Sequence, residues 1–402
     1  MKQEKVSLKD LLGFIPESFF DEIAAETKVD FQVKKLNGKV MFNLIMMGLL
    51  DSERISLRVM EQIYSSQKFK IISGISVKEE TKHSSIGDRI SSISSNYFEE
   101  LFIKCVEIFD SKFPNKETEK YTIERFDSTM VSLSSKLLSF GMVSGSKNKE
   151  GKHTINQLKF TIGFNGLIPH NVKIYTAQQH ISEDLPLYET IMANKYDEKS
   201  IAVFDRGLKS RKRFAAIDKA KKLFVTRINP TKNYEVRETV SAKSFETAGL
   251  IIDKELKVYL FNADSKAVKT ELRLIIGRQK ENNQPIYFVS NITDLKAEEI
   301  CEIYKKRWDI EVFFRFLKQE LNLKHLVSRT ANGIKVMLYM TLITAMLLLI
   351  YKKINNIKGY KMAKRQFVSE LDNEILKTII IACNGDPNML NKIKTFKGFG
   401  HP

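Results

Sequence analysis

The chain has 402 residues, which is long enough for more than one domain and for a sizeable buried core. Its formal net charge of +17 attracts nucleic acid or an anionic membrane surface through long-range electrostatics and counterion release. The three cysteines are far apart and the six histidines show no metal-ligand spacing. These counts argue against a disulfide framework and a zinc site, and they indicate a reducing cytoplasm.

The beginning of the chain, MKQEKVSLKDLLGF, lacks the apolar run of a signal peptide. Residues 1–115 carry apolar clusters at helical spacing, as in FNLIMMGLLDSERISLRVMEQIY, and we expect an all-helical N-terminal domain. A basic helical module suits DNA binding, but the pattern fits a plain helical bundle equally well.

Residues 116–227 change to a mixed α/β pattern. YTIERFDSTMVSL is β-rich, and LKFTIGFNGLIPHNVKIYTA has two strand-like runs on either side of Asn165-Gly166, which is a strong hairpin signal. The predicted order is strand, hairpin, helix, strand, helix, strand. This order indicates the first part of an α/β core with a mixed sheet.

Residues 228–292 are predicted to form a block of antiparallel strands, 293–352 a helical second part of the core, and 353–402 a helical tail. Residues 336–351 are a run of 16 largely apolar residues between two lysines. A membrane-spanning helix needs about 20, so we expect a buried core helix and no membrane partner. A membrane anchor is the alternative, and extraction by salt without detergent would exclude it.

YKKRWDIEVFFRFLK, at residues 304–318, is predicted as one helix. Tyr304, Glu311 and Lys318 are each seven residues apart and share a stripe, with Arg307 one turn before Glu311. By itself this pattern suits a solvated amphipathic helix with ordinary i,i+4 pairs equally well. A second stripe, apolar and at core spacing, contains Ile310, Phe314, Leu317 and Leu321.

Three acids form a candidate catalytic site. TIERFD ends at Asp127 and SIAVFD ends at Asp205, after which Gly207 is expected to let the chain turn sharply. Adjacent strand ends would bring the two aspartates together, and Glu311 lies on the helix that follows the β block. Two-metal phosphoryl transfer needs several carboxylates around hard cations. A turn cap explains each aspartate alone equally well, so the hypothesis depends on all three acids.

The helix resembles the Tyr-(2)-Arg-(3)-Glu-(6)-Lys pattern of DDE transposases from bacterial insertion sequences, the IS-four family. Asp127-Ser128-Thr129 and Asp205-Arg206-Gly207 resemble the surroundings of the two aspartates in that family. The β-rich block and the helical text around SLRVME agree as well, so the resemblance covers roughly residues 10–350. The four positions of the pattern are filled here by Tyr304, Arg307, Glu311 and Lys318.

The resemblance implies an RNase H-like catalytic core, interrupted by the antiparallel insertion and preceded by the helical domain. It implies two Mg²⁺ ions, or Mn²⁺ in their place, held by Asp127, Asp205 and Glu311. The reaction would be hydrolysis at the element end, which frees a 3′-hydroxyl, and attack of that hydroxyl on target DNA. The implied partners are the terminal inverted repeats, target DNA and a second copy of the chain in a synaptic complex.

Several cations are candidates for contact with DNA. Arg307 and Lys318 would bind phosphates that flank the scissile bond, and the Tyr304 hydroxyl would donate to a phosphate. Trp308 would stack on an unpaired base, although packing in the core is the favoured expectation for it. A solvated helix face explains the remaining candidates about as well: these are Arg206, Lys209 and Arg211.

His180 and Asp184 resemble a family stretch after the hairpin, and a local cap is the favoured interpretation. Two other functions fit the same residues. One is a catalytically inactive, domesticated DNA-binding protein, and the other is an RNase H-like nuclease without strand transfer. Nicking without joining would favour the nuclease, and binding without nicking would favour the inactive protein.

Overall fold

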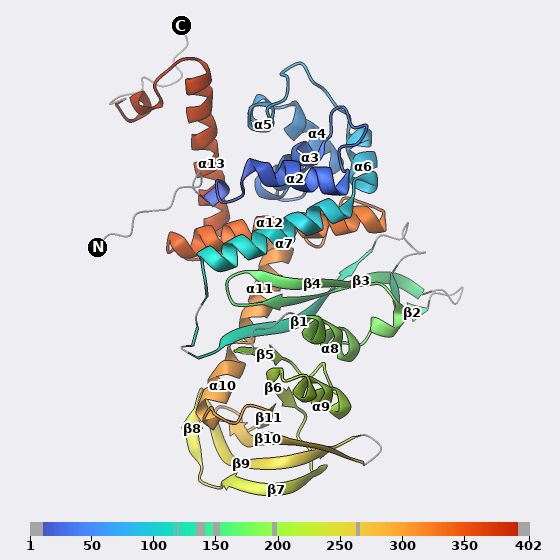
Figure 1. The fold of residues 1–402 in the computed structure, drawn as a ribbon, viewed down its shortest axis with the longest axis vertical. Helices are drawn as coiled ribbons and strands as arrows, with labels where there is room; N and C mark the ends of the chain where they lie inside the picture. Colours follow the sequence, from blue (N-terminus) through green and yellow to red (C-terminus); the bar gives the residue numbers. More distant parts are fainter. Residues whose placement is uncertain are drawn as a thin grey trace. The chain divides into compact units, whose positions relative to one another are not determined.

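The computed structural model describes residues 11–115, 117–118, 120–133, 141–147, 153–194, 199–262 and 266–392. The chain forms two compact units. One combines Met1–Ile108 with Gln319–Pro402, and the other is Phe109–Lys318. The first unit is helical in its described part, and the second is built on a mixed sheet (Figure 1).

The first unit brings together helices from the two ends of the chain. Its central helices, α3 and α12, are buried along almost their whole length. The side chain of Thr330 caps α12 by accepting a hydrogen bond from the Gly333 amide at 3.1 Å. The helices are α2 (Glu17–Thr27), α3 (Gly38–Asp51), α4 (Leu57–Ser65), α5 (Gln67–Ser73), α6 (His83–Ser92), the start of α7 (Ser95–Lys112), α12 (Ala331–Ile354), α13 (Tyr360–Ala382) and the 3₁₀ turn η3 (Pro387–Lys392).

Helix α12 contains the apolar run at 336–351. Among the described residues it is the one helix long and apolar enough to cross a membrane, and 94% of that window is buried within the protein. It packs on α3, α6 and α13. The apolar run is therefore a core helix of this unit, as its length indicated.

The second unit is built on an 11-stranded sheet. Strands β1, β5 and β6 are parallel, and the remaining pairings are antiparallel. The order is β2-β3-β1-β5-β6-β11-β10-β9-β7, with β4 also on β3 and β8 on β9. The strands are β1 (Thr122–Ser132), β2 (Met142–Lys147), β3 (His153–Phe164), β4 (Pro169–Tyr175), β5 (Ser200–Phe204), β6 (Leu223–Ile228), β7 (Tyr234–Ser241), β8 (Phe245–Thr247), β9 (Leu250–Phe261), β10 (Ala267–Gln279) and β11 (Pro285–Ser290).

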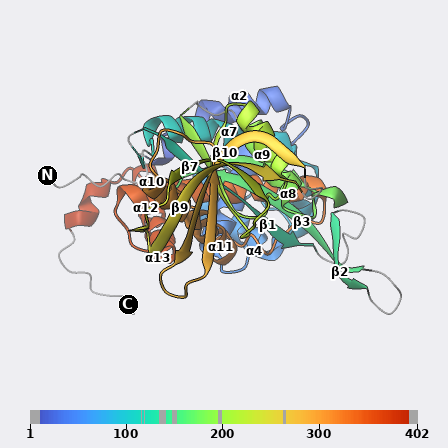
Figure 2. The ribbon, with the colours of Figure 1, turned by 90° about the horizontal axis from the view of Figure 1, so that it is seen from below.

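The antiparallel strands of residues 228–292 continue the central sheet. Strand β11 pairs with β6, so β7 and β9–β11 extend the sheet beyond its parallel part. Figure 2, seen from the β7 end, shows these strands fanned out by the twist that a large sheet accumulates. The short strands β2 and β8 were not predicted, because neither has enough residues for a clear alternation.

The predicted hairpin at Asn165-Gly166 is present between β3 and β4. Gly166 has φ of +92°, a conformation that favours glycine. The Asn165 side chain closes the turn, since its Oδ1 accepts from the amides of Leu167 and Ile168, both at 2.9 Å. Asn165 and Gly166 therefore form the hairpin turn that the sequence predicted.

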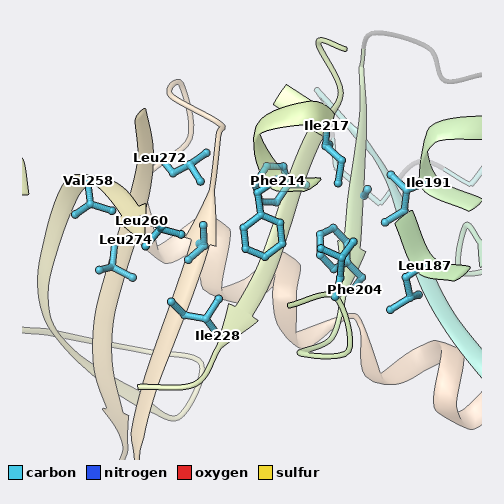
Figure 3. Close-up of a cluster of buried hydrophobic side chains, with 14 of the residues drawn as sticks. Leu187, Ile191, Phe204, Phe214, Ile217, Ile228, Val258, Leu260, Leu272 and Leu274 are labelled. Atoms are coloured by element: carbon cyan, nitrogen blue, oxygen red, sulfur yellow. The ribbon is translucent and has the colours of Figure 1, made fainter. Parts of the chain in front are cut away.

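After Ser200, strand β5 is apolar because both of its faces are buried. Ala202 and Phe204 join the cluster formed with α8 (Asp184–Ala193) and α9 (Arg211–Lys219) (Figure 3). Ile201 and Val203 point the other way and pack with α10 (Ala297–Lys305). Burying each such side chain contributes about 1.5–3 kcal/mol. These two cores hold the carboxyl end of β5, where the candidate acids lie, in a fixed position.

The single helix predicted over 304–318 is wrong. Helix α10 ends at Lys305 and α11 (Trp308–Glu320) begins after a turn, in which the Arg307 amide donates to the Tyr304 carbonyl at 3.0 Å. Arg125 of β1 holds this turn: its Nε donates to the Lys306 carbonyl at 3.0 Å. No proline or glycine marks the break, so helical spacing could not predict it. The apolar stripe is nevertheless buried as expected: Ile310, Phe314, Leu317 and Leu321.

Candidate active site

The register of β1 and β5 places two acids side by side. Phe126 and Phe204 are the last paired residues of these parallel strands, so Asp127 and Asp205 each come next. The prediction that Asp127 ends its strand is wrong, because β1 runs on to Ser132 in its pairing with β3. Asp127 instead marks the point where β1 loses its β5 neighbour. The two side chains thus share one edge of the parallel part of the sheet.

Like charges dominate the surroundings of Asp127. Burial, Asp205 and Glu183 raise the pKa of Asp127 to about 7, while a hydrogen bond from the Ser128 amide at 2.7 Å and the charge of Arg307 oppose this shift. The fold thus places these carboxyl groups close together without fully compensating their charge. This is the electrostatic pattern of a site prepared for a cation.

Gly207 leaves space between two of the acids. A Cβ atom placed on Gly207 would lie 2.4 Å from Glu183 Oε2 and 2.8 Å from Asp205 Oδ1, which no real side chain tolerates. The Gly207 amide also donates to Asp205 Oδ1 at 2.7 Å. Its φ is not positive. The expected turn is present at Arg206 and Gly207, and the glycine is needed there because a Cβ would crowd the two carboxylates.

The third predicted acid, Glu311, is paired with a cation. Arg307 Nη2 lies 2.7 Å from Glu311 Oε1, the i,i+4 contact that the spacing indicated. The charge of Arg307 also acts on Asp127. Over the described ranges, no three His, Cys, Asp or Glu side chains are arranged so that they could hold a metal ion. Arg307 therefore joins two of the predicted acids, Glu311 by direct contact and Asp127 through its charge.

Tyr304 lies between two arginines. It is buried against Phe288, with ring centroids 5.2 Å apart, and burial raises its pKa. The guanidinium carbons of Arg307 and Arg227 lie 5.7 and 5.9 Å from its ring centroid. In the part of the chain that the structure describes, Nε of each arginine is buried without a hydrogen-bond partner. The two guanidinium groups thus place positive charge on the ring of Tyr304 while these Nε donors stay buried.

Arg227 was missed by the sequence reasoning. The available signal was a single charged residue inside LFVTRI, the buried strand β6. Arg206, which donates to Asn229 Oδ1 at 3.1 Å, adds a further positive charge that acts on Arg227. The structure thus adds Arg227 to the cations that the sequence predicted around the acids.

The structure contradicts core packing for Trp308. Its side chain is 54% exposed, because it lies at the first residue of α11, directly after the break in the helix. Lys318 lies on the same helix two turns after Glu311 and is partly buried.

Lys209 and Arg211 line a cavity of about 760 Å³, together with Lys212 and Asp184. Burial lowers the pKa of Arg211. The lining thus combines three cations, one acid and the ring of Phe261.

Asp184 has a structural role at the start of α9. Its Oδ1 accepts from the Ser210 amide at 2.9 Å and from the Lys209 amide, and its carboxylate pairs with Arg213. These amides lie 25 and 26 residues away in the chain, so the local cap that was favoured for the stretch after the hairpin is wrong. The adjacent acid, Glu183, was missed by the sequence reasoning, although its carboxylate faces Asp205.

Residues 120–347 match the family model of the transposase DDE domain. A Synechocystis sp. protein named as a transposase of insertion sequence element IS4SA is 29% identical over 239 residues, which are 58% of this chain and 62% of that protein. A Geobacillus stearothermophilus protein, named as a transposase of element IS5377, is 26% identical over 222 residues, or 55% of this chain and 54% of its own length. The chain thus spans between half and two thirds of the length of these relatives.

The fold is similar to that of piggyBac transposase in a cryo-EM structure of its synaptic complex with hairpin DNA. The TM-score is 0.50 at 10% sequence identity, over 100% of this chain and 88% of that one. At this identity the likeness concerns the fold alone. It agrees with the mixed α/β fold described above.

Proposed function

Because the chain belongs to the transposase DDE domain family, we propose that it cuts DNA at the ends of its insertion sequence and joins the freed 3′-hydroxyl to target DNA. The observation that carries this proposal is that Asp127 and Asp205 each follow the last paired residues of β1 and β5, Phe126 and Phe204. Two carboxylates held side by side, with the pKa of Asp127 raised by burial and by the charge of Asp205, are suited to a divalent cation.

The donor set fits a hard cation such as Mg²⁺, or Mn²⁺ in its place. All the donors are carboxylate oxygens, and Gly207 leaves a space between Asp205 and Glu183 that a Cβ would fill. We assign Asp127, Asp205 and Glu311 as the ligands of two such ions. When bound, the ions would activate the attacking water or hydroxyl and stabilise the leaving oxygen.

Glu311 must leave Arg307 before it can act as a ligand. A DNA phosphate offers the Arg307 guanidinium two oxygens and competes well with a single carboxylate contact of 2.7 Å. Binding of the DNA end would thus turn Arg307 toward the phosphate and release the Glu311 carboxylate. In this scheme the acid site is completed only when DNA is present, which limits cleavage elsewhere.

The remaining cations hold the DNA strand. Arg227 and Arg307 would direct their unpaired Nε atoms to phosphates around the Tyr304 hydroxyl, and Trp308 would stack on an unpaired base. These residues form a basic surface on one side of the acids. The other phosphate contacts we propose are Lys318, Arg206, Lys209 and Arg211.

The DNA partners in this proposal are the terminal inverted repeats and the target duplex, with two copies of the chain in the synaptic complex. The N-terminal helices, residues 1–115, would recognise the repeat sequence. The strands of 228–292 would contact the cleaved end, between the two parts of the catalytic core at 116–227 and 293–352. The reaction would take place in the bacterial cytoplasm, on nucleoid DNA.

The test is Mg²⁺-dependent nicking and strand transfer on a labelled duplex that carries the ends flanking the gene. Wild type should nick and join, and Glu311→Gln should bind the end but not cut it. Glu302→Gln, at an exposed acid on α10, is the matched control and should behave as wild type. Normal cutting by Glu311→Gln would overturn the site. Nicking without joining by the wild type would show a nuclease without strand transfer. Binding without nicking by the wild type would show an inactive DNA-binding protein.

A further inference from the structure

We propose that Glu183 is a fourth acid of this site and binds the same divalent cation as Asp205. The inference rests on the proposed function, since it assumes that the aspartates hold a metal. It adds a ligand from the start of α8 to those expected from β1, β5 and α11.

The geometry around Gly207 carries the inference. Glu183 Oε2 and Asp205 Oδ1 lie 2.4 and 2.8 Å from the point where a Gly207 Cβ would be. Two carboxylate oxygens, one from the start of α8 and one from the end of β5, thus lie close to a single point beside the Gly207 backbone. Hard cations take carboxylate oxygens from several elements at once, and oxygens this close together can share one cation.

Glu183 has no evident structural task. It stands at the N-cap of α8, yet its side chain makes no capping hydrogen bond. Within the described ranges, its carboxylate also has no hydrogen bond or ion pair. Its neighbours differ, because Asp184 caps α9 and Glu189 lies 3.4 Å from His180. Burial and Asp205 raise the pKa of Glu183, which is the cost of holding this carboxylate beside another.

A buried lysine fixes the backbone in front of Glu183. Lys159 on β3 is only 1% exposed, and its ammonium group donates to the carbonyls of Ile181 and Ser182 at 2.7 and 2.6 Å. Burial lowers the pKa of Lys159 and the charge of Glu183 opposes that shift. A buried ammonium costs several kcal/mol unless it is paired and hydrogen-bonded. The fold thus buries the Lys159 ammonium group at a place where its two hydrogen bonds fix the backbone before Glu183.

The first experiment measures Mn²⁺ binding to the full chain without DNA, by titration calorimetry or by electron paramagnetic resonance. Glu183→Gln keeps the size of the side chain and removes its charge. Its Mn²⁺ affinity should fall by about 10-fold or more, as expected for loss of a group that binds or orients a metal. The matched control is Glu189→Gln on the same helix, which should bind Mn²⁺ as wild type does. Unchanged affinity in Glu183→Gln would overturn the inference.

A second variant separates ligation from a structural role. A thiolate prefers softer metals, so Glu183→Cys should raise the ratio of Cd²⁺ to Mn²⁺ affinity, whereas a purely structural residue would leave this ratio unchanged. An unchanged ratio would count against Glu183 as a ligand. If Glu183→Gln binds Mn²⁺ and cuts DNA normally, this inference alone fails. If wild type never cuts DNA but loses Mn²⁺ with Glu183→Gln, the proposed function fails and the inference stands.

Discussion

Buried charges occur in two kinds of place on the central sheet, and the two are built differently. At Arg125 and Arg273 the charges are matched. Arg273 donates to Glu255 at 2.7 Å and to the Ile292 carbonyl at 2.6 Å. Arg125 donates to the Ile123 carbonyl, to Glu117 and to Asp309, the last at 3.0 Å. Each guanidinium joins a loop or a turn to a strand, so these groups hold the fold together.

Where β1 and β5 part, the charges are not matched. Asp127, Asp205 and Glu183 repel one another. Arg307 already pairs with Glu311, and Lys159 and Lys209 only partly offset the charge effect on Glu183. The comparison teaches that the same sheet pairs its charges where it needs stability and leaves them unpaired where it needs a ligand. Four changes test this difference.

Asp205→Asn should have the largest effect on activity. Loss of a ligand that supplies several kcal/mol of transition-state stabilisation should lower the nicking rate by at least about 10³-fold. Without metal, the free energy of unfolding should stay equal or rise, because a like charge is removed from the acid site. Rate and denaturant unfolding should be measured on the same preparation. A large loss of stability would mean that Asp205 is structural, like the acids around Arg125.

Arg125→Met should have the largest effect on stability. Removing the buried partner of an ion pair costs about 3–5 kcal/mol, and here Glu117 keeps only Lys306, at 3.3 Å, in place of Arg125. The turn that carries Arg307 loses its contact with β1 as well, so nicking should also fall. The exposed Arg315→Met on α11 is the control and should change the free energy of unfolding by less than about 0.5 kcal/mol. Equal effects in the two variants would refute the comparison.

Trp308→Ala should weaken binding to an unpaired DNA end by about 1–3 kcal/mol, the range for loss of base stacking. Its effect on stability should be below about 0.5 kcal/mol, since the side chain is exposed. Phe313→Ala on the same helix gives the contrast, because Phe313 stacks on Phe164 at 4.6 Å and its loss costs about 3–5 kcal/mol. The readouts are anisotropy with end DNA and urea unfolding. Unchanged DNA binding by Trp308→Ala would remove it from the site.

Glu124 offers a smaller test that depends on pH. Burial raises its pKa above the usual value, with Asp110 and Glu117 adding to the shift and His170 and Arg125 opposing it. An acid whose pKa is raised in the folded state binds its proton more tightly there than in the unfolded state. The stability it contributes is therefore present at low pH and is lost as pH rises through the folded pKa.

Glu124→Gln should therefore flatten the fall in stability with rising pH between the usual glutamate pKa and the raised one. The measurement is the free energy of unfolding of both proteins across this range. An identical slope in the variant would show that Glu124 is compensated in the folded protein, like the acids around Arg125. Gln at position 124 keeps the size of the side chain, so packing is not at issue.

The sequence by itself determined the features that depend on local pattern. The apolar run of β5, the hairpin at Asn165-Gly166 and the buried stripe of α11 follow from periodicity and turn chemistry within a few residues. The order of the acids and of the cations around Glu311 was enough to indicate the family. Each of these signals is written in neighbouring residues.

Only the tertiary structure decided the rest, because contacts between residues far apart in the chain set it. Arg125 captures a carbonyl 181 residues away and breaks the predicted helix, which leaves Trp308 exposed. Pairing with β3 carries β1 past Asp127. Lys159 brings Glu183 to the space beside Gly207, a position that no spacing in the sequence could indicate. Periodicity shows which face of a helix or strand is buried, whereas these long-range contacts determine which residues that face packs against.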